Sequence, residues 1–277
     1  MYISVRKFTF LTNFSVQIYG SVLVYSIYLY MPDILDIVSP MNESRSRKQY
    51  FKLEYLVPEE QHVFFYRMHI IFVMVFIATI FFANIVQFVT LAQHVCGMCE
   101  LLGYRAERLF CVVESTTGRD LGRSKKLIYR NTAIFIQLHH NTIQFVGTIE
   151  RFYTIPFLLD FLGVVITLSL TLSQVVSNDV EQLVRSMCLT NMQISYITLS
   201  NYMGQQIIDK SSNIYDKVYN SEWYNAIVSQ QKPLLLIMRQ RFLPLVITSC
   251  KFYVMSLANL GKIFQMTASY CMFIRQV

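Results

Sequence analysis

Two cysteines and the histidines near them are the residues best suited to metal or redox chemistry. Cys96 and Cys99 have the spacing of a zinc or redox motif, and His94 is close to them in sequence. A zinc site needs a second ligand pair, and the sequence has no other cysteine pair with this spacing. His139 and His140 are adjacent, so on a helix they face different sides. We therefore predict no metal site and no cofactor, and we expect the cysteines to pack between helices.

Asp160 is the other candidate for chemistry, because it lies inside an apolar stretch where carboxylates can relay protons or ions. It is only two turns from Arg151, and we favour the alternative that it is paired or close to water. Four common enzyme signatures, GxSxG, HExxH, GxGxxG and the P-loop, are absent. No pair of carboxylates recurs on a helix face in a way that suits acid–base catalysis. We predict that the protein is not an enzyme.

The composition indicates a membrane protein. Of the 277 residues, 54 % are hydrophobic and 15 % are charged, whereas soluble domains average about 45–50 % and about 25 %. The mean hydropathy is +0.39. A net charge of +7 could suggest a nucleic-acid partner, but the basic residues lie between the apolar spans. We therefore expect a lipid bilayer as the surroundings, and no nucleic acid.

Five stretches are long enough to cross the bilayer as helices, which takes about 20 mainly apolar residues. The second is the most apolar, and the fourth is the weakest because it contains Arg185, Asn191, Gln193 and Asn201. The predicted fold is therefore an all-α integral membrane protein with five transmembrane helices. The five stretches are Phe8–Met31, Val63–Leu91, Phe152–Val176, Leu183–Met203 and Tyr253–Phe273.

Lys and Arg residues predict the orientation of the chain. They cluster before the first span, after the second and after the fourth, which all lie on one side if the spans alternate. We place that side in the cytoplasm, so the N-terminus of this chain is cytosolic and the C-terminus is extracellular. The glycosylation sequon at Asn42 then falls in the outer loop, 32–62, and we predict that it is used.

The cytosolic segments have helical patterns of their own. Apolar residues recur at helical spacing over 127–150, which predicts that the third span is the outer end of a longer helix. Lys232–Arg241 is a second predicted helix, with Pro233 near its start, and Pro244 ends it before the last span. The predicted division is 1–95 for two spans, 96–151 for a cytosolic loop and helix, 152–206 for two spans, 207–252 for a cytosolic segment, and 253–277 for the last span.

The last quarter of the chain resembles the insect odorant receptor family. The segment Tyr215–Tyr224 closely resembles the family segment after the sixth span, and Ser269-Tyr270 with Gln276-Val277 is similar to the ending of the related gustatory receptors. His94, Cys96 and Gly97 resemble the inner end of the family's fourth span. The other residues in matching order are Gly204, Ser211, Ser212, Lys232, Met238, Pro244, Lys251, Phe252 and Leu257.

This resemblance implies a multi-pass plasma-membrane protein, a subunit of a ligand-gated, non-selective cation channel. In the family, four subunits surround one pore, usually as a heterotetramer with an odorant co-receptor. The five spans would be the third to seventh of seven, so we interpret the chain as a fragment that lacks the first two helices. Segment 207–252 would supply a cytosolic anchor, and 253–277 would line the pore.

Two sets of site residues follow. Small, volatile, apolar ligands should bind in the outer half of the bundle, whose aromatic and Met-containing walls offer few hydrogen-bonding groups. The pore should be lined by a stripe of the last span, with an apolar gate at its outer end. The predicted ligand residues are Tyr25, Tyr28, Leu29, Met68, His69, Phe72, Phe76, Met192 and Tyr196, and the predicted pore and gate residues are Gln265, Ser269, Phe273 and Val277.

Three alternatives stay open at this stage. One is a gustatory-type receptor of the same superfamily. Another is a multi-pass transporter, which should show inverted repeats or paired broken helices; neither is visible in the sequence. The third is a receptor coupled to G proteins, whose Asp-Arg-Tyr and Asn-Pro-x-x-Tyr patterns are missing.

Overall fold

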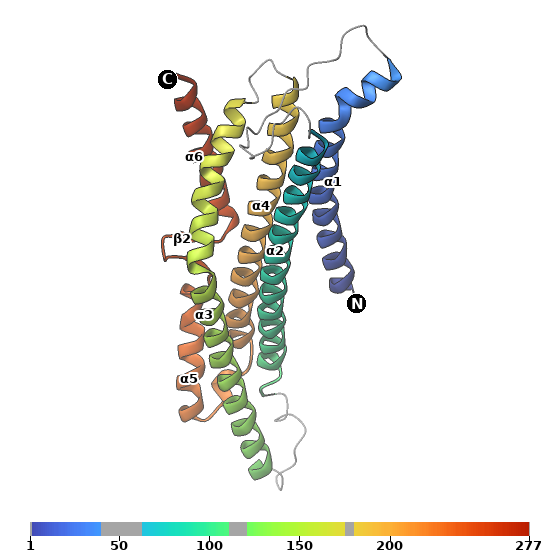
Figure 1. Cartoon of the computed structure of the whole chain (residues 1–277). Coiled ribbons are helices and arrows are strands. Elements are labelled where there is room, and N and C mark those ends of the chain that lie inside the picture. Colours follow the sequence, from blue (N-terminus) through green and yellow to red (C-terminus); the bar gives the residue numbers. More distant parts are fainter. Residues whose placement is uncertain (1, 40–62, 111–120, 175–179, 277) are drawn as a thin grey trace. The chain divides into compact units, whose positions relative to one another are not determined.

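In a computed structural model, the described residues form long helices and one short β-hairpin (Figure 1). The structure describes residues 2–39, 63–110, 121–174 and 180–276. Within these, the description does not extend to the side chains of 2–10, 121–125, 172–174, 180–182, 185, 225 and 274–276. The outer loop with Asn42, and also Val277, lie outside the described residues.

Five long helices overlap the five predicted spans. They are α1 (Tyr2–Val38), α2 (Val63–Glu107), α3 (Leu121–Gln174), α4 (Val180–Tyr219) and α6 (Leu257–Gln276). In the described residues, three helices have both the length and the apolar composition of a membrane span: Leu11–Val38, Val63–Glu107 and Lys126–Thr171. These three correspond to the first three predicted spans, whereas spanning by α4 and α6 stays a prediction.

The long helix predicted for the third span is confirmed. α3 runs without a break from Leu121 to Gln174 and continues through Pro156. α1 likewise continues through Pro32 to Val38, past the predicted end at Met31. Its last turns bend away from the axis of the rest (Figure 1), as expected where a proline removes one helical hydrogen bond.

The segment before the last helix differs from the prediction in two ways. The short helix α5 covers Val228–Arg239, so Pro233 lies inside it rather than near its start. Further along the chain, Tyr253 belongs to a strand and not to the last span: β1 (Thr248–Ser249) pairs antiparallel with β2 (Tyr253–Val254), and α6 begins only at Leu257. Short 3-10 turns cover Trp223–Asn225 and Gln240–Phe242.

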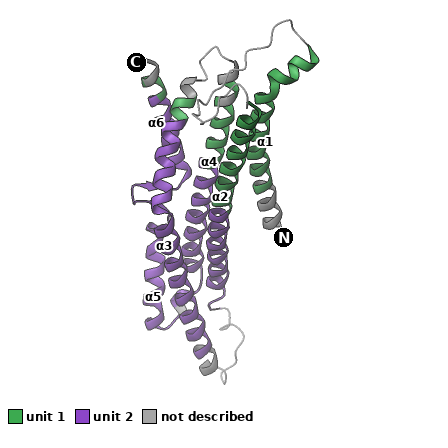
Figure 2. Cartoon of the chain, in the orientation of Figure 1, with its two compact units in different colours: residues 1–86, 168–196, 271–277 green, residues 87–167, 197–270 purple. Residues whose placement is uncertain are grey.

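The chain divides into two compact units (Figure 2). Unit 1 comprises residues 1–86, 168–196 and 271–277, and unit 2 comprises 87–167 and 197–270. α1 lies wholly in unit 1, α5 and the hairpin lie wholly in unit 2, and the other long helices contribute to both. In unit 1 the buried stripe of α1 recurs at helical spacing: Phe14, Ile18, Val22 and Tyr25.

Unit 2 has a continuous core in which α2 and α4 run parallel. The buried residues of α2 alternate steps of four and three, as in coiled coils: Phe88, Ala92, Val95, Cys99, Leu102 and Ala106. Lys210 of α4 pairs with Glu100 at 2.8 Å, and Lys217 pairs with Glu107 at 3.2 Å. Both partners advance by seven residues, which fixes the parallel register. A side chain at Gly103 would lie 2.8 Å from the Lys217 stem, so glycine leaves room for this pairing.

Many hydroxyl and amide side chains bond back to their own helix. Each donates to a carbonyl oxygen three or four residues earlier, so a polar group inside a span is satisfied without a neighbour. Examples in both units are Ser15, Ser21, Ser26, Thr79, Asn84, Thr142, Thr148, Thr154, Thr167, Asn201 and Ser269.

Candidate ligand-binding and pore residues

Polar side chains connect α1 to α4 within unit 1. Gln17 Nε2 donates hydrogen bonds to Asn191 Oδ1 at 2.8 Å and to Ser195 Oγ at 2.5 Å. Asn191 and Ser195 are one turn apart on α4, so they face α1 together. These contacts bring Asn191, one of the polar residues of the weakest predicted span, against α1.

An ion pair connects α1 to α2. Arg67 of α2 donates to the carboxylate of Asp33, and its guanidinium lies over the ring of Tyr30, 5.5 Å from the centroid. The side chain of Arg67 is only 13 % exposed. A second contact between these helices joins the hydroxyls of Tyr19 and Thr79 at 3.3 Å. The pair thus holds the ends of both helices together beside the predicted ligand residues.

The predicted ligand residues of α1 and α4 lie at or near helix contacts. Tyr25 is buried, whereas Tyr28 and Leu29 are partly buried. On α4, Met192 and Tyr196 are also partly buried, and the ring of Tyr196 meets that of Phe81 edge-on at 6.0 Å. The structure therefore brings Tyr196 to α2, although at Phe81, which sequence analysis did not select.

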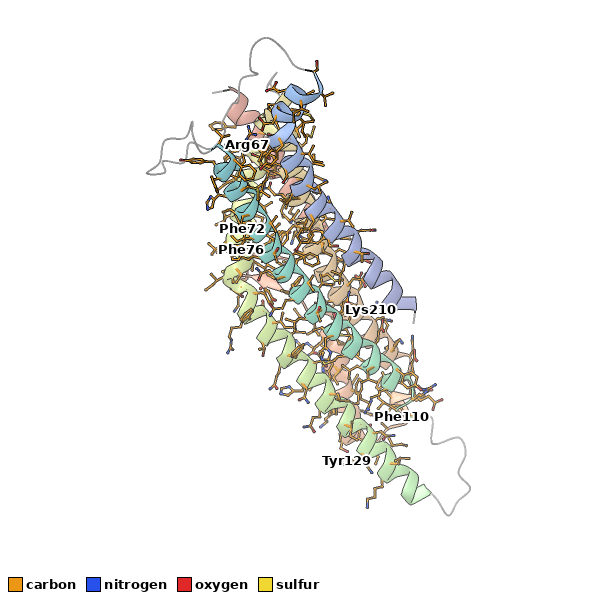
Figure 3. The ribbon with its side chains drawn as sticks, turned by 45° about the vertical axis from the view of Figure 1, so that its right-hand side comes forward. Arg67, Phe72, Phe76, Phe110, Tyr129 and Lys210 are labelled. Atoms are coloured by element: carbon orange, nitrogen blue, oxygen red, sulfur yellow. The ribbon has the colours of Figure 1, made fainter. Side chains whose placement is uncertain are left out.

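The predicted ligand residues of α2 lie on its exposed side. Phe72 is 69 % exposed and Phe76, one turn later, is 60 % exposed (Figure 3). Met68 and His69 are exposed as well. Their part in ligand binding stays a prediction.

The predicted pore residues lie on exposed parts of α6. Gln265, Ser269 and Phe273 are exposed, and Val277 is outside the described residues. The buried line of this helix is Leu260, Ile263 and Thr267. The remaining faces are exposed too, including Ala268 and Met272. The exposure of Gln265, Ser269 and Phe273 therefore agrees with a pore-lining stripe, but it does not distinguish this stripe from the other exposed faces of α6.

A hydrogen-bonded joint that sequence analysis did not predict precedes α6. Asn201 of α4 is 1 % exposed, and its Oδ1 accepts hydrogen bonds from the Tyr253 hydroxyl at 2.6 Å and from the backbone N–H of Ser256 at 3.1 Å. The one available signal was an amide inside the weakest apolar span, because a buried amide needs a partner. Its partner could not be identified without the hairpin.

The cysteine and histidine motifs have structural surroundings. Cys99 is buried in the α2 core stripe, whereas Cys96 is partly exposed. His139 is buried between the rings of Phe135 and Tyr215, while His140 is exposed and bonds to Gln144. Among the residues that the structure describes, no group of three or more His, Cys, Asp or Glu could hold a metal ion.

In unit 2, pairing and burial favour the protonated forms of Lys210 and Tyr215. The Glu100 carboxylate, which accepts a hydrogen bond from the Lys210 ammonium, raises the pKa of Lys210 above its usual value. Burial raises the pKa of the Tyr215 hydroxyl to about 12. Both groups therefore keep their protons at neutral pH, so these shifts support packing and pairing of α2 with α4 rather than proton transfer.

Comparison with known proteins identifies the family. The sequence profile of a family described as the 7tm odorant receptors matches residues 4–268. The chain belongs to this family. The receptor is 26 % identical over 165 residues to odorant receptor Or2 of Anopheles gambiae, covering 59 % of the receptor and 43 % of Or2. The chain thus spans less than half the length of that relative.

Solved structures show the same fold. The olfactory receptor OR5 of Machilis hrabei in complex with eugenol superposes with a TM-score of 0.74 at 12 % identity, covering 98 % of this chain and 66 % of OR5. A second structure of OR5 gives a TM-score of 0.65 at 13 % identity, covering 96 % and 66 %. The all-helical membrane fold of an insect olfactory receptor is therefore shown for this receptor.

Two residues that carried the family resemblance, Ser211 and Gly204, contact the segments before α6 in unit 2. Ser211 Oγ on α4 accepts a hydrogen bond from the backbone N–H of Leu245 at 3.2 Å, just after Pro244. Gly204 lies against Met255: an added Cβ would be 2.4 Å from the Met255 carbonyl oxygen. The resemblance thus follows residues that dock the connection between α5 and α6 onto α4.

Proposed function

We propose that this receptor is a subunit of a ligand-gated, non-selective cation channel that detects small, volatile, apolar molecules together with an odorant co-receptor in a heterotetramer. The observation that carries the proposal is the family match over residues 4–268, supported by the superposition on an olfactory receptor in complex with eugenol. The chain would lie in the plasma membrane, with its C-terminus outside and the N-terminus of this chain inside.

The arrangement of unit 1 supports a ligand site among α1, α2 and α4. Tyr25, Met192 and Tyr196 come from two of these helices and are largely withdrawn from solvent. Aromatic rings and a thioether offer contact area with few directional bonds, which suits apolar ligands. Tyr196 next to Phe81 is the pair that we expect to contact the ligand most closely.

The test is expression of this chain with an insect odorant co-receptor, followed by current recording during application of an odorant panel. We expect currents above those of the co-receptor alone. Tyr196→Ala should change the order of odorant responses, with the exposed Tyr129→Ala as matched control. Absence of any additional current, although the chain reaches the cell surface, would overturn the proposal.

A cysteine scan of α6 tests the pore assignment separately. Thiol reagents should change the current at Gln265, Ser269 and Phe273, and much less at Ala268 or Ile274, because the first three recur at four-residue steps along one stripe. Modification all round the helix, or at none of these positions, would remove α6 from the pore.

A further inference from the structure

The hairpin before α6 is attached to α3. Thr248 donates from its hydroxyl to the Glu150 carboxylate, and Ser249 Oγ donates to the Thr154 carbonyl at 3.1 Å. The ring of Tyr253 stacks on Phe161, with centroids 4.9 Å apart and planes at 29°. Every strand residue named here is buried. The hairpin is therefore an ordered connection between α5 and α6.

The same connection is attached to α4 through the first backbone groups of α6. The N–H groups at the start of a helix have no partners inside the helix. Asn201 Oδ1 accepts the N–H of Ser256, and Gln205 Oε1 accepts that of Leu257 at 3.3 Å. Ser256 Oγ in turn accepts the N–H of Asn259 at 3.3 Å. Two side chains of α4 thus cap α6.

Gly204 brings the two backbones close enough for this capping. It lies between Asn201 and Gln205 on α4, and an added Cβ would be 2.4 Å from the Met255 carbonyl oxygen. That contact is with backbone, so a side chain at 204 would push residue 255 away from α4. The two accepting side chains, Asn201 and Gln205, and the close backbone contact at Gly204 therefore lie together, just before α6 begins.

We propose that Asn201 is a positioning residue of the pore helix: it fixes the N-terminal end of α6 to α4, so that α6 pivots about this end when the channel opens. Separating this end from α4 would leave the Ser256 N–H and the Tyr253 hydroxyl without acceptors in an apolar interior, which is strongly unfavourable. By contrast, Gln265 and Ser269 further along α6 are exposed. The pore role of α6 rests on the proposed function.

The first test uses amide hydrogen exchange of residues 255–260 in the chain reconstituted in lipid nanodiscs, and it requires no channel activity. Asn201→Leu should accelerate exchange about tenfold or more, and Tyr253→Phe should do so by a smaller factor, because it removes one hydrogen bond. Asn201→Asp keeps the Oδ1 acceptor but loses the amide that donates to the Ile197 carbonyl, so its exchange should lie between that of Asn201→Leu and that of the original. Tyr219→Phe, on the exposed end of α4, is the control.

The second test measures gating in cells that also express the co-receptor. Tyr253→Phe should change the ratio of spontaneous to odorant-evoked current by roughly 2- to 30-fold, the range of typical couplings between sites, at unchanged surface amount. Unchanged exchange in both Asn201→Leu and Tyr253→Phe would contradict the proposal that Asn201 fixes the start of α6 to α4. Faster exchange with an unchanged current ratio would overturn the pivot. If the original chain gives no evoked current, the proposed function fails, while exchange still decides whether Asn201 holds α6.

Discussion

Residues 63–86 and 87–107 of α2 belong to one continuous helix, yet their side chains have opposite surroundings. The first part holds few buried residues, Tyr66, Ala78 and Ile85, whereas the second has a buried residue at every turn from Phe88 to Ala106. The most apolar window of this helix is only 11 % buried within the chain. In α2, therefore, the more apolar half is the less buried one.

This difference follows from the solvent. In water, apolar side chains gather in the interior, whereas in lipid they are equally stable on the outside, and helices associate through close packing and polar contacts. The 87–107 part of α2 has small residues in its stripe, Ala92, Cys99 and Ala106, and ion pairs along its edge. By the predicted topology, the first part of α2 lies in lipid and most of the second part lies in the cytosol, where burying its stripe removes apolar surface from water.

The largest expected effect comes from matched substitutions on the two parts of α2. Phe88→Ala should lower the free energy of unfolding by about 3–5 kcal/mol, because Phe88 is 1 % exposed and contacts the rings of Tyr153 and Phe157 at 5.4 and 4.9 Å. Phe72→Ala should change it by less than about 0.5 kcal/mol. Equilibrium unfolding in mixed micelles measures both, and equal losses would contradict the comparison.

The next effect concerns backbone approach. Gly204→Ala should destabilise the fold by about 1–3 kcal/mol, as overpacking does, because the new Cβ would meet the Met255 backbone. Gly20→Ala in unit 1 is the counterpart, since nothing lies within 4 Å of its Cβ position. We expect no loss there, or a small gain from helix propensity. An unchanged stability of Gly204→Ala would show that the contact between Gly204 and the Met255 backbone is loose.

Unit 1 should depend on the ion pair between its first two helices. Arg67→Met keeps the length of the side chain but removes its charge, and should cost about 1 kcal/mol, near the upper end for partly exposed pairs. Arg67→Lys should recover only part of the loss, because it lacks the planar group that lies over Tyr30. Unfolding midpoints of the three proteins, compared at low and high salt, measure this; full recovery by lysine would exclude a contribution from the ring.

The smallest effect is expected at the more exposed ion pair of unit 2. Lys210→Met should cost about 0.2–1 kcal/mol, since the Lys210 and Glu100 side chains are 37 % and 45 % exposed. The folded state raises the Lys210 pKa, so the stabilisation is complete below the usual lysine value of about 10.4 and disappears as pH rises through the folded pKa. The variant and the original should therefore converge at alkaline pH. A difference that persists there would assign the effect to packing of the stem.

The sequence predicted the long helices because apolar periodicity is local, and it predicted the continuation of α3 for the same reason. It did not predict the hairpin at 248–254, because two-residue strands have no periodicity and the turn uses Cys250 and Lys251 at positive φ rather than the usual Asn-Gly. The sequence did not predict the exposure of Phe72 either, since an aromatic residue fits a pocket wall and a lipid-facing surface alike. Contacts between distant residues, such as Asn201 with Tyr253, require the fold.

The side chains that bond back to their own helix also bear on how the receptor is made. A span whose hydroxyl groups already have hydrogen-bond partners in their own helix can move from the translocon into lipid by itself, before its neighbours are synthesised. α1 has Ser21 and Ser26 in this state. In α4, by contrast, the Asn201 side-chain oxygen has its partners in Tyr253 and Ser256, which are translated some fifty residues later. We expect α4 to reach its final position later than the spans before it, after the ribosome has synthesised the start of α6.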